Sequence, residues 1–359
     1  MKRKLIQICN TGFLCATITA GVLAQGAARP SFDENGVVHV PAFDLPPSEF
    51  LSDEGKALMK MRANRPVDLP TMEPDIQKSR AALAKMLAPQ VESVLKMHPV
   101  NVSEETINGI PTRIFTPKNR DYDHERVLIN LHGGAFNTCW ESCSQLESAP
   151  IADVGGYKVV SVNYRMAPEH KHPAAVEDVA KVYAQLLKSY DPGHIGIYGC
   201  SAGGSLTAQT AAWLPAHDLP QAAAVGIFGA GGVRFNAGDS AYIAGYIDGS
   251  FPPPAKQGEK SIDMTRGYFS DKDMLDPMIS PAMHRDVLQT YPPTLIITGT
   301  RAMDMSPAIV TNSNLLKAGK SSTLIVGEGM GHCYIYTAHL PEAQDAYKVI
   351  VEFFNDNLQ

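Results

Sequence analysis

The stretch that decides the fold is Ile195-Gly196-Ile197-Tyr198-Gly199-Cys200-Ser201-Ala202-Gly203. Its first four residues are typical of a buried strand, and the residues from 205 to 213 have helical spacing. The segment Gly199–Gly203, of G-x-S-x-G type, therefore occupies a sharp turn between a strand and a helix, where the flanking glycines relieve crowding. The start of that helix directs N–H groups and positive dipole at a reacting group. This pattern predicts Ser201 as a nucleophile.

A second glycine motif is His132-Gly133-Gly134-Ala135-Phe136, which follows an apolar strand ending at Leu131. Acyl transfer places negative charge on a carbonyl oxygen, and fixed backbone N–H groups stabilise that charge. Glycine lets the backbone approach this oxygen closely. We therefore predict an oxyanion hole formed by the N–H groups of Gly133, Gly134 and Ala202.

Strand and helix patterns alternate through the central and C-terminal parts of the chain. Asn108-Gly109 marks a hairpin turn, and the Gly-, Pro- and Tyr-rich segment 231–292 interrupts the alternation as an insertion. Alternation of this kind predicts an α/β fold with a mostly parallel sheet and helices on both faces. The expected strands are 107–116 (as a hairpin), 127–131, 159–162, 195–198, 222–228, 295–297 and 322–326, and the expected helices are 49–61, 76–97, 176–187, 205–213, 307–316 and 343–354.

The first residues have the pattern of a targeting segment. Lys2-Arg3-Lys4 precedes an apolar stretch, and Val22-Leu23-Ala24 precedes a plausible cleavage near Gln25. We expect residues 1–24 to be a Sec-type signal peptide that exports the protein to the periplasm or the medium. An uncleaved membrane anchor is the alternative, but the apolar stretch is short and interrupted for a span. We therefore expect no stable membrane span after processing.

Composition restricts the partners. The 359 residues carry a formal net charge of −6, with 44% hydrophobic residues and no basic block. A nucleic-acid partner needs clustered Lys and Arg, so none is expected. The sequence does not indicate an oligomeric state.

Taken together, the two glycine motifs resemble those of the hormone-sensitive lipase-like branch of the α/β-hydrolases, the bacterial family IV esterases. The resemblance extends from about Val127 to the C-terminus. It also rests on Tyr164-Arg165-Met166-Ala167-Pro168-Glu169-His170, Pro173-Ala174-Ala175 and Glu328-Gly329-Met330-Gly331-His332. The resemblance implies an α/β-hydrolase fold with a helical cap, and a structural role for the Tyr164–His170 segment.

We expect His332 to be the catalytic base, because it follows the last strand and ends the family-like segment. The resemblance places the acid at Ala302, where no carboxylate is present. Asp304 is the nearest carboxylate, and we favour it as the acid that orients His332. A Ser–His dyad, or another carboxylate such as Glu328, remains open.

Four cysteines follow residue 24: Cys139, Cys143, Cys200 and Cys333. Free buried thiols are favoured, because a helix would hold the first pair too far apart for easy bridging. A Cys200–Cys333 bridge is possible but not deducible. Cys200 also replaces the Asp that relatives usually have before the nucleophile. No CxxC pair or His cluster indicates a metal site, and no cofactor is expected.

The domains expected are residues 1–24 as signal, 25–100 as linker and cap helices, and 101–359 as the catalytic domain with cap insertion 231–292. The leading hypothesis is a carboxylesterase that cleaves short- to medium-chain esters, small-molecule substrates, through an acyl-enzyme. The alternatives are an amidase or peptidase that uses the same triad, and a non-catalytic ligand-binding protein with a decayed triad.

Overall fold

The computed structural model describes residues 29–62, 73–247, 251, 254–255 and 262–359. The chain divides into two compact units, Met1–Pro46 and Pro47–Gln359. In the first unit, strands β1 (Ser31–Phe32) and β2 (Val38–His39) pair antiparallel. The expected signal peptide, residues 1–24, lies outside the described residues and stays a prediction.

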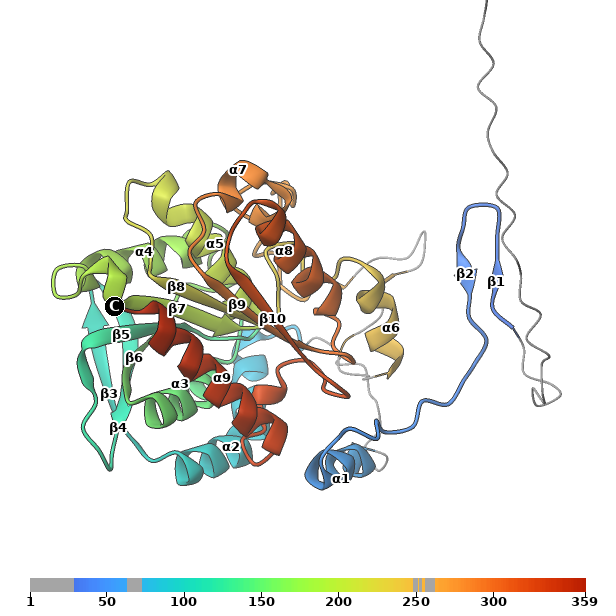
Figure 1. The fold of residues 1–359 in the computed structure, drawn as a ribbon, viewed down its shortest axis with the longest axis horizontal. Helices are drawn as coiled ribbons and strands as arrows, with labels where there is room; N and C mark the ends of the chain where they lie inside the picture. The colour runs from blue at the N-terminus through green and yellow to red at the C-terminus, as the bar shows by residue number, and fades with distance from the viewer. Residues whose placement is uncertain (1–28, 63–72, 248–250, 252–253, 256–261) are drawn as a thin grey trace, which may run out of the picture. The chain divides into compact units, whose positions relative to one another are not determined.

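An eight-stranded sheet forms the centre of the second unit (Figure 1). Its strand order is β10-β9-β8-β7-β5-β6-β4-β3; neighbours run parallel from β10 to β6, and β4 pairs antiparallel with β6 and β3. This order confirms the expected mostly parallel sheet. The strands are β3 (Val100–Ile107), β4 (Ile110–Pro117), β5 (Asp123–Leu131), β6 (Tyr157–Val162), β7 (Ile195–Cys200), β8 (Ala224–Phe228), β9 (Thr294–Gly299) and β10 (Ser322–Gly327).

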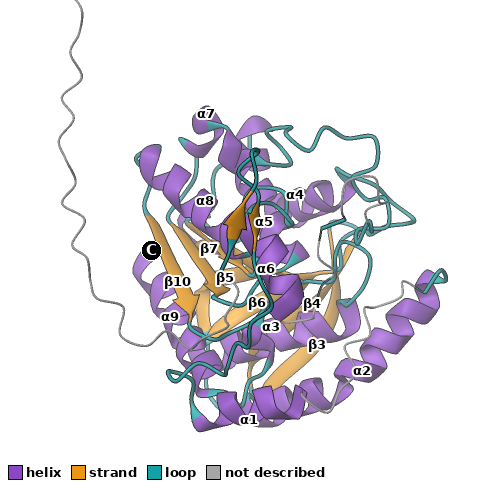
Figure 2. Ribbon diagram, turned by 90° about the vertical axis from the view of Figure 1, so that its right-hand side faces the viewer, coloured by secondary structure: helices purple, strands orange, loops and turns teal. Residues whose placement is uncertain are grey.

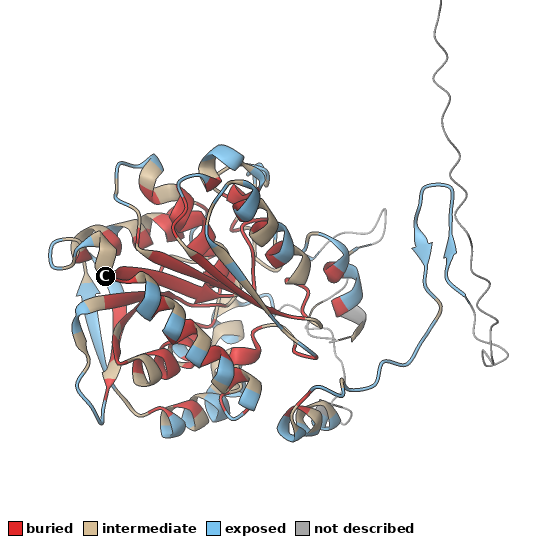
Figure 3. Ribbon diagram, in the orientation of Figure 1, coloured by how far each residue is buried: buried red, intermediate tan, exposed pale blue. Residues whose placement is uncertain are grey.

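Helices lie on both sides of this sheet (Figure 2). They are α1 (Asp53–Arg62), α2 (Ile76–Met97), α3 (Trp140–Gly155), α4 (Ala174–Leu186), α5 (Ala202–Ala216), α6 (Asp239–Ile247), α7 (Arg285–Leu288), α8 (Met305–Lys317) and α9 (Pro341–Asn357). Alternate residues of a strand point to opposite faces. Ile129 of β5 accordingly packs in the core shared with α4, α5 and α8, and Leu128 packs in the core shared with α3 and α9. The middle strands β7, β8 and β9 are thus buried on both faces, whereas the edge strand β3 is mostly exposed (Figure 3).

The predicted hairpin and the long N-terminal helix are both present. Asn108 and Gly109 adopt φ values of 48° and 78° between β3 and β4, the left-handed conformations that a tight hairpin turn requires. The Asp75 carboxylate accepts bonds from the N–H groups of Gln77 and Lys78 and so caps α2. Helix α2 continues through Pro89.

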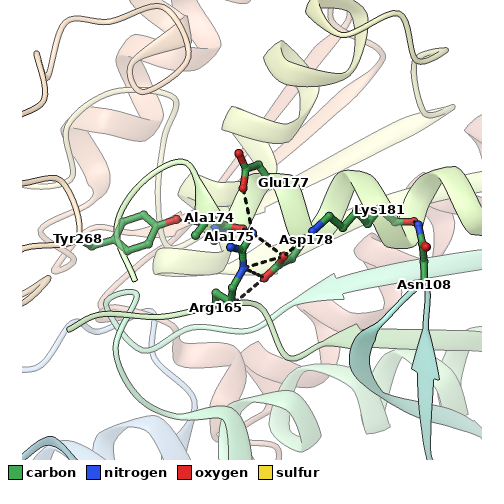
Figure 4. Close-up of polar contacts among 8 residues, drawn as sticks. All are labelled: Asn108, Arg165, Ala174, Ala175, Glu177, Asp178, Lys181 and Tyr268. Carbon is green, nitrogen blue, oxygen red and sulfur yellow. Dashed lines mark hydrogen bonds and ion pairs between the residues drawn. The ribbon is translucent and has the colours of Figure 1, made fainter. Parts of the chain in front are cut away.

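The Tyr164–His170 segment is fixed to α4 by ion pairs of Arg165, of which only the Asp178 side chain is buried (Figure 4). Arg165 Nε donates to Asp178 Oδ1 at 2.9 Å, and its Nη2 donates to Glu177 at 2.9 Å and to the carbonyl of Ala174 at 3.1 Å. The Asp178 side chain is almost fully buried, so the guanidinium neutralises a charge that would otherwise be costly to bury. These contacts fit the structural role that the resemblance implies for this segment.

The described part of the 231–292 insertion contains α6, the short 3₁₀ helix η2 (Pro281–Met283) and α7. The Met264 carbonyl accepts a bond of 2.8 Å from the Asn137 side chain, and Arg266 donates to Ser79 Oγ of α2 at 2.8 Å. The insertion and α2 therefore meet beside the loop that follows β5. The domain boundaries at residues 24 and 100 remain predictions.

Candidate active site

Ser201 is the single residue between strand β7 and helix α5. Its backbone has φ 60° and ψ −123°, a conformation that few residues with a side chain adopt. Its N–H donates to the Phe228 carbonyl at 2.9 Å, which fixes the turn to the end of β8. A Cβ at Gly199 or at Gly203 would collide with the carbonyl oxygen of Leu131. The predicted strand–turn–helix around Ser201 is confirmed, and the two glycines are needed because the neighbouring parallel strand β5 ends against the turn at Leu131.

A chain of three side chains ends at Ser201. His332 Nε2 lies 3.0 Å from Ser201 Oγ, and His332 Nδ1 lies 2.6 Å from Asp304 Oδ1. Asp304 is fully buried, and its other oxygen accepts a 2.5 Å bond from the Thr298 hydroxyl. The geometry is that of a nucleophile, a base and an orienting acid.

The turn after β9 explains how Asp304 replaces a carboxylate at Ala302. The Ala302 N–H donates to the Gly299 carbonyl, and the small Ala302 side chain is buried. Asp304 follows as the residue that precedes α8, and there it reaches His332. The alternative Glu328 is exposed, and none of its described contacts is with His332.

One of the three predicted oxyanion donors is wrong. The N–H of Gly133 donates to Glu147 Oε1 at 2.8 Å, so it is not available to a substrate oxygen. Among the described residues, no acceptor contacts the N–H groups of Gly134 and Ala202, and the same holds for Ala135, which the sequence analysis did not single out. Ala202 opens α5, where the first N–H groups have no partner within the helix. A positive φ at both Gly134 and Ala135 coils this loop.

The expectation of free thiols is wrong, because both cysteine pairs are bridged. Cys200 is bonded to Cys333 and Cys139 to Cys143. Cys139 is not helical: it precedes α3 with φ 76°, and its Cα lies 5.3 Å from that of Cys143. In place of a bracing Asp, Cys200 thus ties the turn of Ser201 covalently to the residue after His332.

Aromatic side chains enclose the imidazole of His332. The rings of Phe235 and Phe251, both from the insertion, lie edge-on to it at centroid distances of 5.3 and 4.9 Å. His132 is buried and stacks on Tyr164, and burial lowers the pKa of His132 to about 4. His132 is therefore a neutral packing residue, and His332 is the histidine beside the nucleophile.

In the described ranges, no group of three or more His, Cys, Asp or Glu residues is arranged to hold a metal ion. Over the same part of the chain, no helix combines the length and apolar character that a membrane span needs.

Comparison with known proteins agrees with this fold. The model of a family described by the alpha/beta hydrolase fold matches residues 128–336. An acetyl-hydrolase of Streptomyces hygroscopicus is 30% identical over 237 residues, which are 64% of this chain and 75% of that protein. The arylacetamide deacetylase of Oryctolagus cuniculus is 36% identical over 121 residues, only 31% of this chain and 30% of the deacetylase.

Two solved structures with a similar fold are esterases. The crystal structure of esterase E25 superimposes with a TM-score of 0.76 and 27% identity, covering 91% of this chain and all of that one. An esterase of the bacterial hormone-sensitive lipase family gives a TM-score of 0.72 at 25% identity, covering 86% of this chain and 98% of that one.

Proposed function

Since this chain belongs to the α/β-hydrolase fold family, in its hormone-sensitive lipase-like branch, we propose that it is a serine carboxylesterase that cleaves short- to medium-chain esters through an acyl-enzyme. The observation that carries the proposal is the continuous contact from Ser201 through His332 to Asp304. The proposed substrates are small-molecule carboxylic esters, and the proposed reaction requires no cofactor.

In the proposed reaction, Ser201 Oγ attacks the ester carbonyl while His332 Nε2 takes the proton of the Ser201 hydroxyl. Asp304 holds Nδ1 protonated and stabilises the imidazolium that forms. The N–H groups of Gly134 and Ala202, with Ala135 as a third donor, bind the oxyanion. His332 then returns the proton to the leaving alcohol, and water repeats the sequence on the acyl-enzyme.

Export to the periplasm or the medium is a further part of the proposal. The Lys2-Arg3-Lys4 start and the apolar stretch after it support a signal peptide. The two disulfides support it too, because such bonds persist in oxidising compartments.

An amidase that uses the same residues is the second candidate, and the similarity to an arylacetamide deacetylase favours it. Hydrolysis of p-nitrophenyl acetate, butyrate and octanoate, measured against p-nitroacetanilide, separates the two. We expect turnover of the acetate and butyrate esters, complete loss in Ser201→Ala, and rapid labelling of Ser201 by a fluorophosphonate. A wild-type protein without turnover or labelling would reject the enzyme and favour a ligand-binding protein.

A further inference from the structure

A carboxylate that the proposed mechanism does not use lies beneath the site. Glu147, in the middle of α3, is only 3% exposed. Its Oε1 accepts bonds from the Gly133 N–H at 2.8 Å and the Tyr336 hydroxyl at 2.6 Å. Its Oε2 accepts bonds from the Asn130 side chain at 2.9 Å and the Cys200 N–H at 3.2 Å. Both oxygens are thus fully engaged.

Three of the four donors lie beside the segments that carry the oxyanion donors, Ser201 and His332, and the fourth, Asn130, lies within β5. Gly133 precedes the oxyanion donor Gly134 in the loop after β5, and Cys200 is the last residue of β7, directly before Ser201. Tyr336 belongs to the 3₁₀ helix η3 (Tyr334–Tyr336), which follows His332 after β10. Each loop is therefore held at, or close to, the residue beside its catalytic group.

The packing around Gly133 is independent evidence that these loops meet there. A Cβ added at Gly133 would lie 2.5 Å from the Tyr336 hydroxyl, 3.1 Å from the Cys200 carbonyl oxygen and 3.3 Å from Ser201 Cβ. No side chain fits between the three loops. Their separation is fixed by the groups that Glu147 binds.

We propose that Glu147 is a positioning residue for ester hydrolysis, whose carboxylate sets the oxyanion-binding amides, Ser201 and the His332 loop at their working distances. The inference rests on the proposed function, and it gives a buried carboxylate a role outside the triad. The Asn130 side-chain oxygen accepts a 2.7 Å hydrogen bond from the Ser161 hydroxyl, so Asn130 anchors the carboxylate to the sheet.

The chemistry of the side chain matters as well as its shape. Above about pH 7 the Glu147 carboxyl is ionised and accepts hydrogen bonds from all four donors, whereas the amide of glutamine offers one acceptor oxygen and turns an NH₂ group toward two donors. Glu147→Gln thus preserves volume but leaves two donors without an acceptor. Because preorganised donors act on charge that develops in the transition state, their displacement lowers kcat more than it raises KM.

The experiment compares kcat, KM and the affinity for a trifluoromethyl ketone, which forms an oxyanion on Ser201, in the wild type and Glu147→Gln. We expect kcat to fall on the order of 100-fold, with KM little changed and ketone affinity reduced in parallel. Thermal unfolding is recorded for each variant. If Glu147→Gln does not fold, Tyr336→Phe takes its place. This variant keeps the carboxylate and removes one donor, and its kcat should be lower than that of the wild type on the order of tenfold.

Glu141→Gln is the matched control, because Glu141 lies on the same helix but contacts Arg113 instead of the loops. Its kcat should equal that of the wild type. A folded Glu147→Gln with normal kcat, or with reduced kcat and unchanged ketone affinity, would overturn the positioning role while the esterase proposal stands. A wild type that neither hydrolyses esters nor reacts with a fluorophosphonate would overturn both.

Discussion

Asp304 stands two residues beyond Ala302, the position where the family resemblance places the acid, yet its carboxylate lies 2.6 Å from His332 Nδ1. The Thr298 hydroxyl bonds the second oxygen and keeps the carboxylate in this orientation. An acid partner needs only to reach the imidazole and fix its tautomer, so a shifted origin along the chain is compatible with catalysis.

Asp304→Asn should therefore lower kcat on p-nitrophenyl butyrate by about 10⁴-fold, because an amide stabilises the wrong tautomer of His332. Glu328→Gln is the control, since Glu328 is exposed and belongs to the same loop as His332. Activity of Asp304→Asn close to that of the wild type would mean that a dyad, or another carboxylate, carries the reaction.

Glu147 also makes stability depend on pH. Burial raises the pKa of its carboxyl to about 7 despite four hydrogen bonds that lower it. Between about pH 4.5 and pH 7 the folded protein holds a proton that the unfolded chain releases, so this group makes the free energy of unfolding fall as pH rises. Below this window both states are protonated, and above it both are ionised.

Urea unfolding at pH 5, 6 and 7 tests this effect. The free energy of unfolding of the wild type should decline relative to that of Glu147→Gln across the window, because the amide does not titrate. Parallel pH profiles for the two proteins would show that the carboxyl has an ordinary pKa in the folded state.

At the scale of elements, the strands and helices with a clear period were predictable and α3 was not. Helix α2 has an apolar stripe and begins at a capping Asp75, so its bounds follow from the sequence. Helix α3 is Ser-rich, contains Pro150 and is buried along most of its length, so it has no stripe. Glu147 was missed for that reason, and the wrong oxyanion role for Gly133 followed from missing its acceptor.

The Arg80 side chain joins helix α2 to the loop after β5 that holds the oxyanion donors. Arg80 Nε donates to the Asn137 carbonyl at 2.8 Å, and its guanidinium pairs with both oxygens of Glu169 at 2.7 and 2.8 Å. The pair is partly exposed, so it contributes little to stability by itself. Arg80 should instead help to fix the position of the loop that holds Gly134.

Arg80→Ala should reduce kcat/KM on p-nitrophenyl butyrate on the order of tenfold, with little change in melting temperature. Arg80→Lys should not restore the rate, because an ammonium lacks the planar fork that serves Glu169 and Asn137 together. Lys85→Ala removes the same charge from an exposed position of α2 and should be neutral. Equal kcat/KM values for Arg80→Ala and Lys85→Ala would mean that the Arg80 contacts of α2 do not influence ester hydrolysis.

At the scale of the whole second unit, the order of the chain determines where the site lies. Parallel strands bring their carboxyl ends to one edge, and β5, β7, β9 and β10 deliver the oxyanion loop, Ser201, Asp304 and His332 there. This placement was predictable from strands and motifs alone. The cysteine pairing was not, because bridging depends on a distance across the fold that the sequence does not state.

The Cys200–Cys333 bond joins residues 133 positions apart and links the turn of Ser201 to the loop of His332. A bond that closes so long a loop restricts the unfolded chain strongly and should contribute roughly 2–5 kcal/mol to the free energy of unfolding. The Cys139–Cys143 bond closes a very short loop and should contribute less.

The exported protein should show no maleimide-reactive thiol in denaturant before reduction and four such thiols after it. The Cys200→Ser, Cys333→Ser double variant should lose more stability than the Cys139→Ser, Cys143→Ser pair, as measured by urea unfolding. Reactive thiols in the unreduced protein, or equal losses for the two variants, would mean that the longer bond does not stabilise the fold, and the catalytic loops would then depend on hydrogen bonds alone.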